Sequence, residues 1–141
     1  MLFRSLGLAE TVEIPGRRFR LEDLLPRVRE LGVGLVPLVR DVMTDIMLPT
    51  KLLEYVRLGV PVVVSWTPTI AQYFPDDTVR YVRDLSPGAV ADAVAELLRE
   101  PVAAQRRAAR AQALPIARAW QEGGESEFVN LVKELGSSGN A

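Results

Sequence analysis

The sequence predicts an α/β fold in which a parallel sheet is flanked by helices. Short apolar or β-branched runs, typical of strands, alternate along the chain with longer segments whose apolar residues recur about every 3.6 residues. Two of the runs, VGLVPLV and PVVVS, are apolar along almost their whole length, as strands buried on both faces of a parallel sheet usually are. Such alternation of strands with helices is the pattern that builds parallel sheets.

The expected elements repeat a strand–helix unit. Strands are expected at residues 11–14, 33–39, 61–65 and 79–82, and helices at residues 2–8 (the end of one), 21–31, 49–58, 68–74, 88–100, 102–113, 116–121 and 126–135. Residues 41–47 are expected to form a loop. Pro49 fits the first turn of the helix that follows, and Gly59 fits its left-handed end. Residues 1–135 are therefore predicted to form one domain, followed by a disordered tail at residues 136–141.

The composition excludes several classes of function. The 141 residues include no Cys and no His, which excludes disulfides, Ser-His or Cys-His catalysis and His or Cys metal sites within this chain. The formal net charge of -1 gives no field that would favour nucleic acid. No apolar run approaches the roughly 20 residues that span a bilayer. We expect a cytoplasmic protein without nucleic-acid partners.

The first turn of the helix at residues 49–58 is a candidate anion site. Ligands of parallel sheets bind beyond the carboxyl ends of the strands, and the loop after residues 33–39 leads from such an end into this helix. The free main-chain N–H groups near Thr50, Lys51 and Leu52, with the helix dipole, would attract an anion such as a diphosphate. The Thr50 hydroxyl and the Lys51 ammonium could add direct contacts to phosphate oxygens.

Glu54 lies one turn further along the same helix. A carboxylate accepts two hydrogen bonds from a vicinal diol, such as the 2′,3′-hydroxyl pair of a ribose. Lys51 and Glu54 also have the i,i+3 spacing of a helical surface ion pair. The spacing alone favours the surface ion pair over the ligand site, and both interpretations stay open at this point.

The run from Pro49 to Val63, P-T-K-L-L-E-Y-V-R-L-G-V-P-V-V, resembles the donor-site segment of GT-B glycosyltransferases. It is similar in particular to the large retaining family often labelled group 1, whose members commonly read S-P-x-K-L-x-E-Y-x-A-x-G-x-P-V-V here. Further similar pieces follow the family's order, at residues 12–17, 33–38 and 67–74 and at Trp120 with the last predicted helix. The resemblance covers roughly residues 5–135.

The resemblance implies both a fold and an activity. The fold would be half of a GT-B donor domain, a partial Rossmann-like parallel sheet flanked by helices, with a helical C-terminus. The chain would be the nucleotide-sugar-binding portion of a glycosyltransferase, which moves a hexosyl group from a nucleoside diphosphate sugar to an acceptor hydroxyl. The nucleoside diphosphate sugar is the donor substrate, and no cofactor or metal is implied, because helix-end N–H groups and cationic side chains would stabilise the leaving diphosphate.

The resemblance also assigns roles to individual residues. It places Glu54 at the ribose of the nucleotide. The other assigned residues are Thr50, Lys51 and Leu52 at the diphosphate and Gly16, Arg17 and Phe19 beside the base.

Departures from the family pattern bear on activity. Many relatives have a second Glu that contacts the donor sugar, where this chain has Ile46 with Asp45 beside it. Leu48 replaces the usual Ser before Pro49. The sequence also contains neither an N-terminal acceptor-binding domain nor the first two strands of the donor domain. We therefore expect this chain to be inactive alone.

Without the first two strands of the donor domain, the sequence predicts a sheet with an open edge. In the strand order 3-2-1-4-5-6, residues 11–14 are the third strand and residues 33–39 the fourth, and the first two would lie between them. The edge along residues 33–39 is then exposed and apolar, which favours association. We expect the isolated chain to be marginally stable or to need a partner.

Other functions stay open. The chain could be a gene fragment, or a natural subunit that pairs with a separate acceptor-binding chain. Alternatively, it is a non-catalytic α/β interaction domain without a nucleotide site. A group of arginines could contact a membrane surface peripherally, although a solvated helix face is the simpler interpretation: Arg106, Arg107, Arg110 and Arg118.

Overall fold

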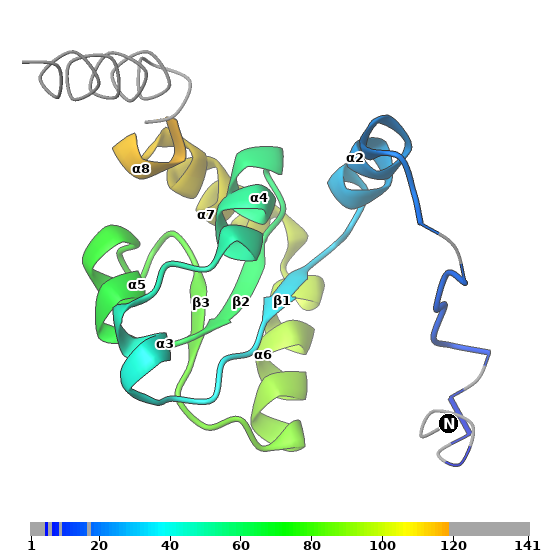
Figure 1. Ribbon diagram of the computed structural model, residues 1–141, viewed down its shortest axis with the longest axis horizontal. Helices are drawn as coiled ribbons and strands as arrows, with labels where there is room; N and C mark the ends of the chain where they lie inside the picture. The colour runs from blue at the N-terminus through cyan, green and yellow to red at the C-terminus, as the bar shows by residue number, and fades with distance from the viewer. Residues whose placement is uncertain (1–4, 6, 9, 17, 119–141) are drawn as a thin grey trace, which may run out of the picture.

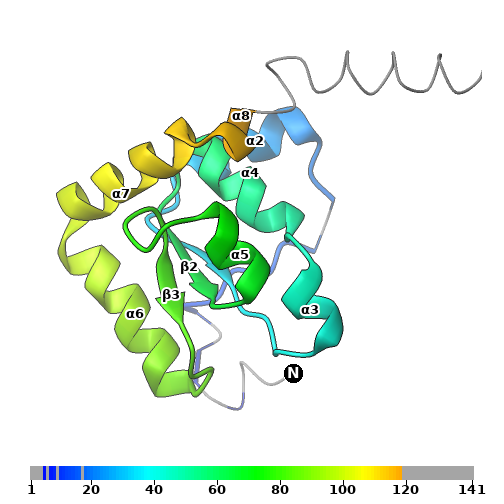
Figure 2. The same ribbon diagram turned by 90° about the vertical axis from the view of Figure 1, so that its left-hand side faces the viewer.

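The computed structural model describes residues 5, 7–8, 10–16 and 18–118 of the chain. Within them, a three-stranded parallel sheet has the order β1-β2-β3. The strands are β1 (Gly34–Val36), β2 (Val62–Ser65) and β3 (Arg80–Val82). Helices lie on both faces of this sheet (Figure 1 and Figure 2). The predicted α/β fold, a parallel sheet flanked by helices, is confirmed.

The described helices connect the strands and then form the C-terminal part. They are α2 (Leu21–Arg29), α3 (Val42–Ile46), α4 (Thr50–Leu58), α5 (Pro68–Tyr73), α6 (Pro87–Arg99), α7 (Pro101–Ala113) and α8 (Pro115–Arg118). The helices expected at residues 21–31, 49–58, 68–74, 88–100 and 102–113 are confirmed, and their ends shift by one or two residues.

β2 lies at the centre of the hydrophobic core. All of its residues are buried, as expected for a β-branched run between two other strands. On one face, Val62 and Val64 belong to a cluster with residues of α4 and α5, including Leu52. On the other face, Val63 packs in a cluster with residues of α6. α7 contributes alanines to both clusters, and it runs from the end of α6 across to α4 (Figure 2).

Two glycines allow α4 to pack against the sheet. Gly59 ends the helix in the left-handed region, with φ of 74°, and the next N–H, that of Val60, donates to the Tyr55 carbonyl at 3.0 Å. At Gly34 the ring of Tyr55 packs directly on β1, because a Cβ there would lie 2.7 Å from two of its ring atoms. A side chain at position 34 would therefore push α4 away from the strand.

The prediction of a strand at residues 11–14 is wrong. These residues form a turn and irregular structure, and Ile14 is 54% exposed. β-branched residues stabilise a strand only where neighbouring strands supply hydrogen bonds and a buried face. In the described part of the chain no strand pairs with this segment.

The loop expected at residues 41–47 is also wrong, because this segment contains helix α3. The Asp41 carboxylate accepts a hydrogen bond from the Thr44 main-chain N–H at 2.7 Å, and the Thr44 hydroxyl accepts one from the Asp41 N–H at 2.8 Å. This reciprocal pair is a capping box, which satisfies N–H groups at the start of a helix. The D-x-x-T pattern was the sequence signal for it.

The strand expected at residues 33–39 is confirmed but shorter. Only Gly34–Val36 pairs with β2, and Leu35 is 42% exposed rather than buried on both faces. β1 is an edge strand of the described sheet, so one of its sides has no covering strand.

Several expectations fall outside the described residues, namely those on Arg17, Trp120, the helix at residues 126–135, the tail at 136–141 and most of residues 2–8. Among the described helices, none combines the length and the apolar character needed to cross a membrane.

Candidate functional site at the carboxyl edge of the sheet

The carboxyl ends of the strands meet at one edge of the sheet. Because the strands are parallel, the helices that cover the sheet, α4, α5 and α6, begin near this edge. Ligands of open α/β sheets bind outside the carboxyl ends of the strands. The candidate site therefore consists of the residues that follow β1, β2 and β3, together with the first turn of α4.

The first turn of α4 has an uncompensated positive end. No side chain caps it, and it contains no acidic residue. Thr50 and Lys51 are exposed, as a ligand site requires. The Leu52 N–H, in contrast, donates to the Pro49 carbonyl at 3.1 Å, and the Leu52 side chain is fully buried. Of the three N–H groups that were expected to bind a diphosphate, those of Thr50 and Lys51 therefore remain as candidates.

Lys51 and Glu54 form an ion pair on the surface of α4. The Lys51 Nζ lies 2.7 Å from Glu54 Oε2, and both side chains are more than half exposed. The hydrogen bond that the Lys51 ammonium donates to the Glu54 carboxylate raises the pKa of Lys51. The surface pair expected from the i,i+3 spacing is thus present. The bond uses one oxygen of Glu54, which leaves the other oxygen for a hydroxyl donor.

The residues expected beside a nucleotide base do not join this turn. Gly16 is exposed, and nothing lies within 4 Å of the position of a Cβ on it. Arg17 lies outside the described residues. The ring of Phe19 has the Arg27 guanidinium at 4.8 Å from its centroid. The base-binding part of the predicted site is therefore not assembled in the described chain.

A cluster of two arginines and a tryptophan lies at the carboxyl edge, with one residue after each strand. The Arg83 guanidinium carbon is 4.0 Å from the centroid of the Trp66 ring, and that of Arg40 is 5.3 Å away. The pairing of Ser65 with Val82 explains the first contact, since the next residues, Trp66 and Arg83, are then side by side on one face. Such contacts are cation–π interactions.

The sequence patterns did not predict the cluster of Trp66 with Arg40 and Arg83. Each follows the end of a predicted strand, which was the available signal. The parallel register, which brings them together, was not known.

The carboxylates near this edge are already engaged. Arg40 donates to both oxygens of Asp45, at 2.8 and 2.7 Å, which raises the pKa of Arg40 and lowers that of Asp45. The Ser86 hydroxyl and N–H lower the pKa of Asp84 in the same way. Both oxygens of Asp45 therefore already have a donor. Asp45 is not free to take the role of the second Glu that many members of the resembled family have where this chain has Ile46, which is exposed.

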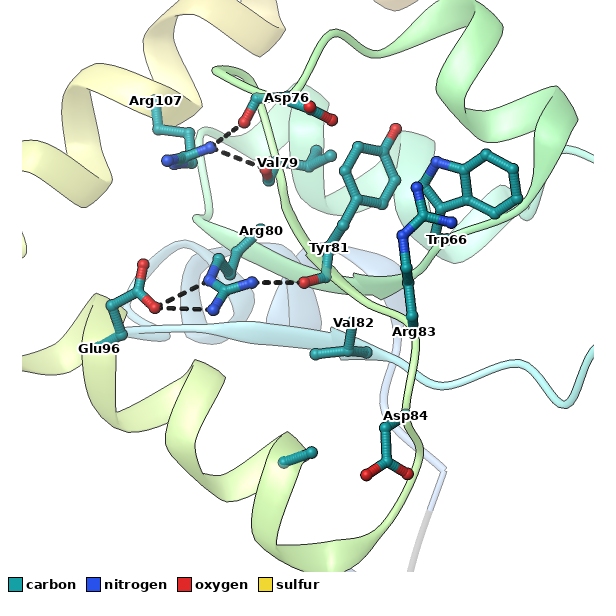
Figure 3. Close-up of a pocket in the computed structure, with 11 residues that line it drawn as sticks. Trp66, Asp76, Val79, Arg80, Tyr81, Val82, Arg83, Asp84, Glu96 and Arg107 are labelled. Carbon is teal, nitrogen blue, oxygen red and sulfur yellow. Dashed lines mark hydrogen bonds and ion pairs between the residues drawn. The ribbon is translucent and has the colours of Figure 1, made fainter.

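A cavity of about 600 Å³ runs along the outer side of β3 (Figure 3). Trp66 and Arg83 border it at the carboxyl edge, and α6 and α7 also contribute to its lining. The Tyr81 hydroxyl donates to the Phe74 carbonyl at 2.7 Å, and burial raises the pKa of this phenol. Tyr81 is thus a structural donor here rather than a group that titrates near neutral pH.

No family model, no curated protein and no solved structure matches this chain.

Proposed function

We propose that this chain is the nucleotide-sugar-binding portion of a glycosyltransferase, half of a GT-B donor domain. The bound molecule is a nucleoside diphosphate sugar, and the hexosyl group passes to an acceptor hydroxyl held by another domain or chain. The support is the sequence resemblance from Pro49 to Val63, together with a parallel sheet whose carboxyl edge carries the first turn of α4. By itself the chain binds the donor and does not catalyse transfer.

The first turn of α4 is the single observation that carries this proposal. A cation at a helix N-terminus opposes the helix dipole, yet Lys51 occupies that position, and its carboxylate partner, Glu54, lies one turn further along the helix. An anion bound to the Thr50 and Lys51 N–H groups would remove the conflict. Local conflicts of this kind are characteristic of functional sites.

Ligand titration tests the proposal. Calorimetric titrations of UDP, GDP and ADP, and of their hexose conjugates, should show binding of at least one of them to the folded chain. If none binds to a sample with a cooperative unfolding transition, the proposed function is wrong.

Glu54→Ala tests the ribose role. This change removes the carboxylate, but it also frees Lys51 for the diphosphate, so total affinity is an ambiguous measure. The useful comparison is between each diphosphate and its 2′,3′-dideoxy analogue, which lacks the diol. Wild type should prefer the diol about tenfold or more, because charge-assisted hydrogen bonds are lost in the analogue, and E54A should not discriminate. Equal discrimination by both proteins would reject the role.

A second candidate function is that of a non-catalytic α/β subunit. The observation that favours it is helix α3, whose residues Val42, Met43 and Ile46 are all strongly exposed apolar side chains. Such a face suits contact with another protein chain. Absence of binding to every nucleoside diphosphate, with the chain folded, would favour this candidate over the first.

A further inference from the structure

Charge at the carboxyl edge of the sheet is almost fully paired. Lys51 contacts Glu54 at 2.7 Å and Arg40 contacts Asp45 at 2.7 Å. A diphosphate carries several negative charges, and these two cations are already shared with carboxylates. Arg83 differs, because it has no ion pair with any carboxylate in the described ranges.

Arg83 is also held in place. Its guanidinium lies over the Trp66 ring, and the two residues are neighbours across the β2–β3 pairing. A guanidinium stacked on a ring keeps its N–H groups in its own plane, where they can donate to an oxyanion. The stack therefore fixes the cation while leaving its donors available.

The other arginines around the cavity have partners. Arg80 pairs with Glu96 at 2.8 Å, and Arg107 donates to main-chain carbonyls. Figure 3 shows Asp84 pointing away from Trp66 and Arg83, and its oxygens accept hydrogen bonds from Ser86. Arg83 is thus the cation of this cavity that a ligand can use without displacing a protein partner.

We propose that Arg83, held over Trp66, is an oxyanion-binding residue of the cavity along β3, with a diphosphate group as its ligand. The inference rests on the proposed function for the identity of the ligand, but the anion site itself does not depend on a base or a ribose. Inorganic pyrophosphate carries the same oxyanions, and it is therefore the probe that isolates this contact.

The test uses the fluorescence of Trp66. The chain holds two tryptophans, so Trp120→Phe leaves Trp66 as the single indole reporter. In this background pyrophosphate should change the emission with a saturable curve, and Arg83→Gln should weaken its binding about tenfold or more. Arg83→Lys keeps the charge but loses the planar donor fork, and it should fall between the two.

The matched control is Arg99→Gln. Arg99 is an exposed arginine in the last turn of α6, the end of that helix opposite to the carboxyl edge, and its loss changes the net charge equally. It should leave pyrophosphate affinity within about twofold of wild type, because a distant exposed charge is screened by salt.

The outcomes separate this inference from the proposed function. Weaker pyrophosphate binding in R83Q, but not in R99Q, supports the inference. Equal weakening in both variants, or none in R83Q, overturns it, even if nucleoside diphosphates bind. Absence of pyrophosphate binding to wild type also overturns it. If R83Q weakens pyrophosphate while nucleoside diphosphates bind no better than pyrophosphate does, the anion site stands and the nucleotide function falls.

Discussion

The two edge strands of the described sheet, β3 and β1, differ in whether side chains bind their outward-facing main-chain carbonyl groups. At β3, the Arg80 guanidinium donates to the Tyr81 carbonyl at 2.5 Å, and Arg107 donates to the carbonyls of Val79, at 2.8 Å, and Asp76 (Figure 3). Arginines therefore occupy acceptors that an added strand would use. The outward carbonyl groups on this side of the sheet already accept hydrogen bonds from guanidinium groups.

β1 has no comparable protection in the described chain. The Gly34 N–H donates to Pro61 in the loop before β2, so alternation along a parallel strand turns the N–H and carbonyl of Leu35 outward. Two exposed leucines flank this side: Leu35, 42% exposed, and Leu98, 56% exposed, which lies against Gly32. In the described sheet, the edge at β3 is therefore closed to further strands, whereas the edge at β1 can still pair with another strand.

Removal of the cap at β3 should have the largest effect. Arg107→Met leaves two main-chain carbonyls without their donor, and we expect a loss of about 1–2 kcal/mol in the free energy of unfolding. Urea denaturation measures that loss. Light scattering should also rise, since the Val79 carbonyl next to β3 becomes available for pairing, although Arg80 still occupies that of Tyr81.

The control for that change is Arg106→Met, the neighbouring exposed arginine on α7. It removes the same charge without touching β3. Similar destabilisation in both variants would show that the caps of β3 have no special role.

The open edge at β1 should control self-association, with a smaller effect on stability. Because β3 is capped, pairing through β1 closes after two copies, so we expect dimers rather than filaments. Leu35→Lys places a charge on the open edge and should weaken dimerisation about tenfold, with little change in the melting temperature. Sedimentation velocity measures the dimerisation, and thermal unfolding followed by circular dichroism measures the melting temperature.

Val102→Lys on α7 is the matched control, since Val102 is also an exposed apolar residue. It should leave the association constant unchanged. A wild-type chain that stays monomeric and melts cooperatively at high temperature would contradict the expected open, adhesive edge.

Sequence patterns located the central elements because their signals are local. β2 is a continuous β-branched run, and α4 has Pro49 before it and Gly59 after it. The segment at residues 11–14 has strand propensity but no neighbouring strand within the described residues, and propensity without a neighbour does not make a strand.

Side-chain partners distant in sequence were beyond such patterns. Arg107 reaches Val79 across 28 positions, and Arg83 meets Trp66 only through the β2–β3 register. The candidate site was therefore predicted where one helix turn contains it, at Thr50, Lys51 and Glu54. The part of the site that depends on the alignment of β2 with β3, the contact between Arg83 and Trp66, was not predicted.

The two sides of the sheet should also differ, more weakly, in their response to acid. The segment after β1 depends on Asp41 and Asp45, whose pKa values are lowered by hydrogen bonds from Thr44 and from Arg40 respectively. A lowered folded-state pKa gives stability that is present above the unfolded value, about 3.9 for Asp, and is lost as pH falls through the folded pKa. The arginine–carbonyl bonds at β3 do not titrate in this range.

Hydrogen exchange therefore should show protection of α3 amides falling below about pH 4, while β3 amides keep theirs. No His is present, so stability should be nearly flat between about pH 6 and 8. Asp45→Asn removes a titrating group and should reduce the acid-dependent loss at α3. An unchanged acid response in D45N, or an equal loss of protection at β3, would mean that acid does not act through the carboxylates that follow β1.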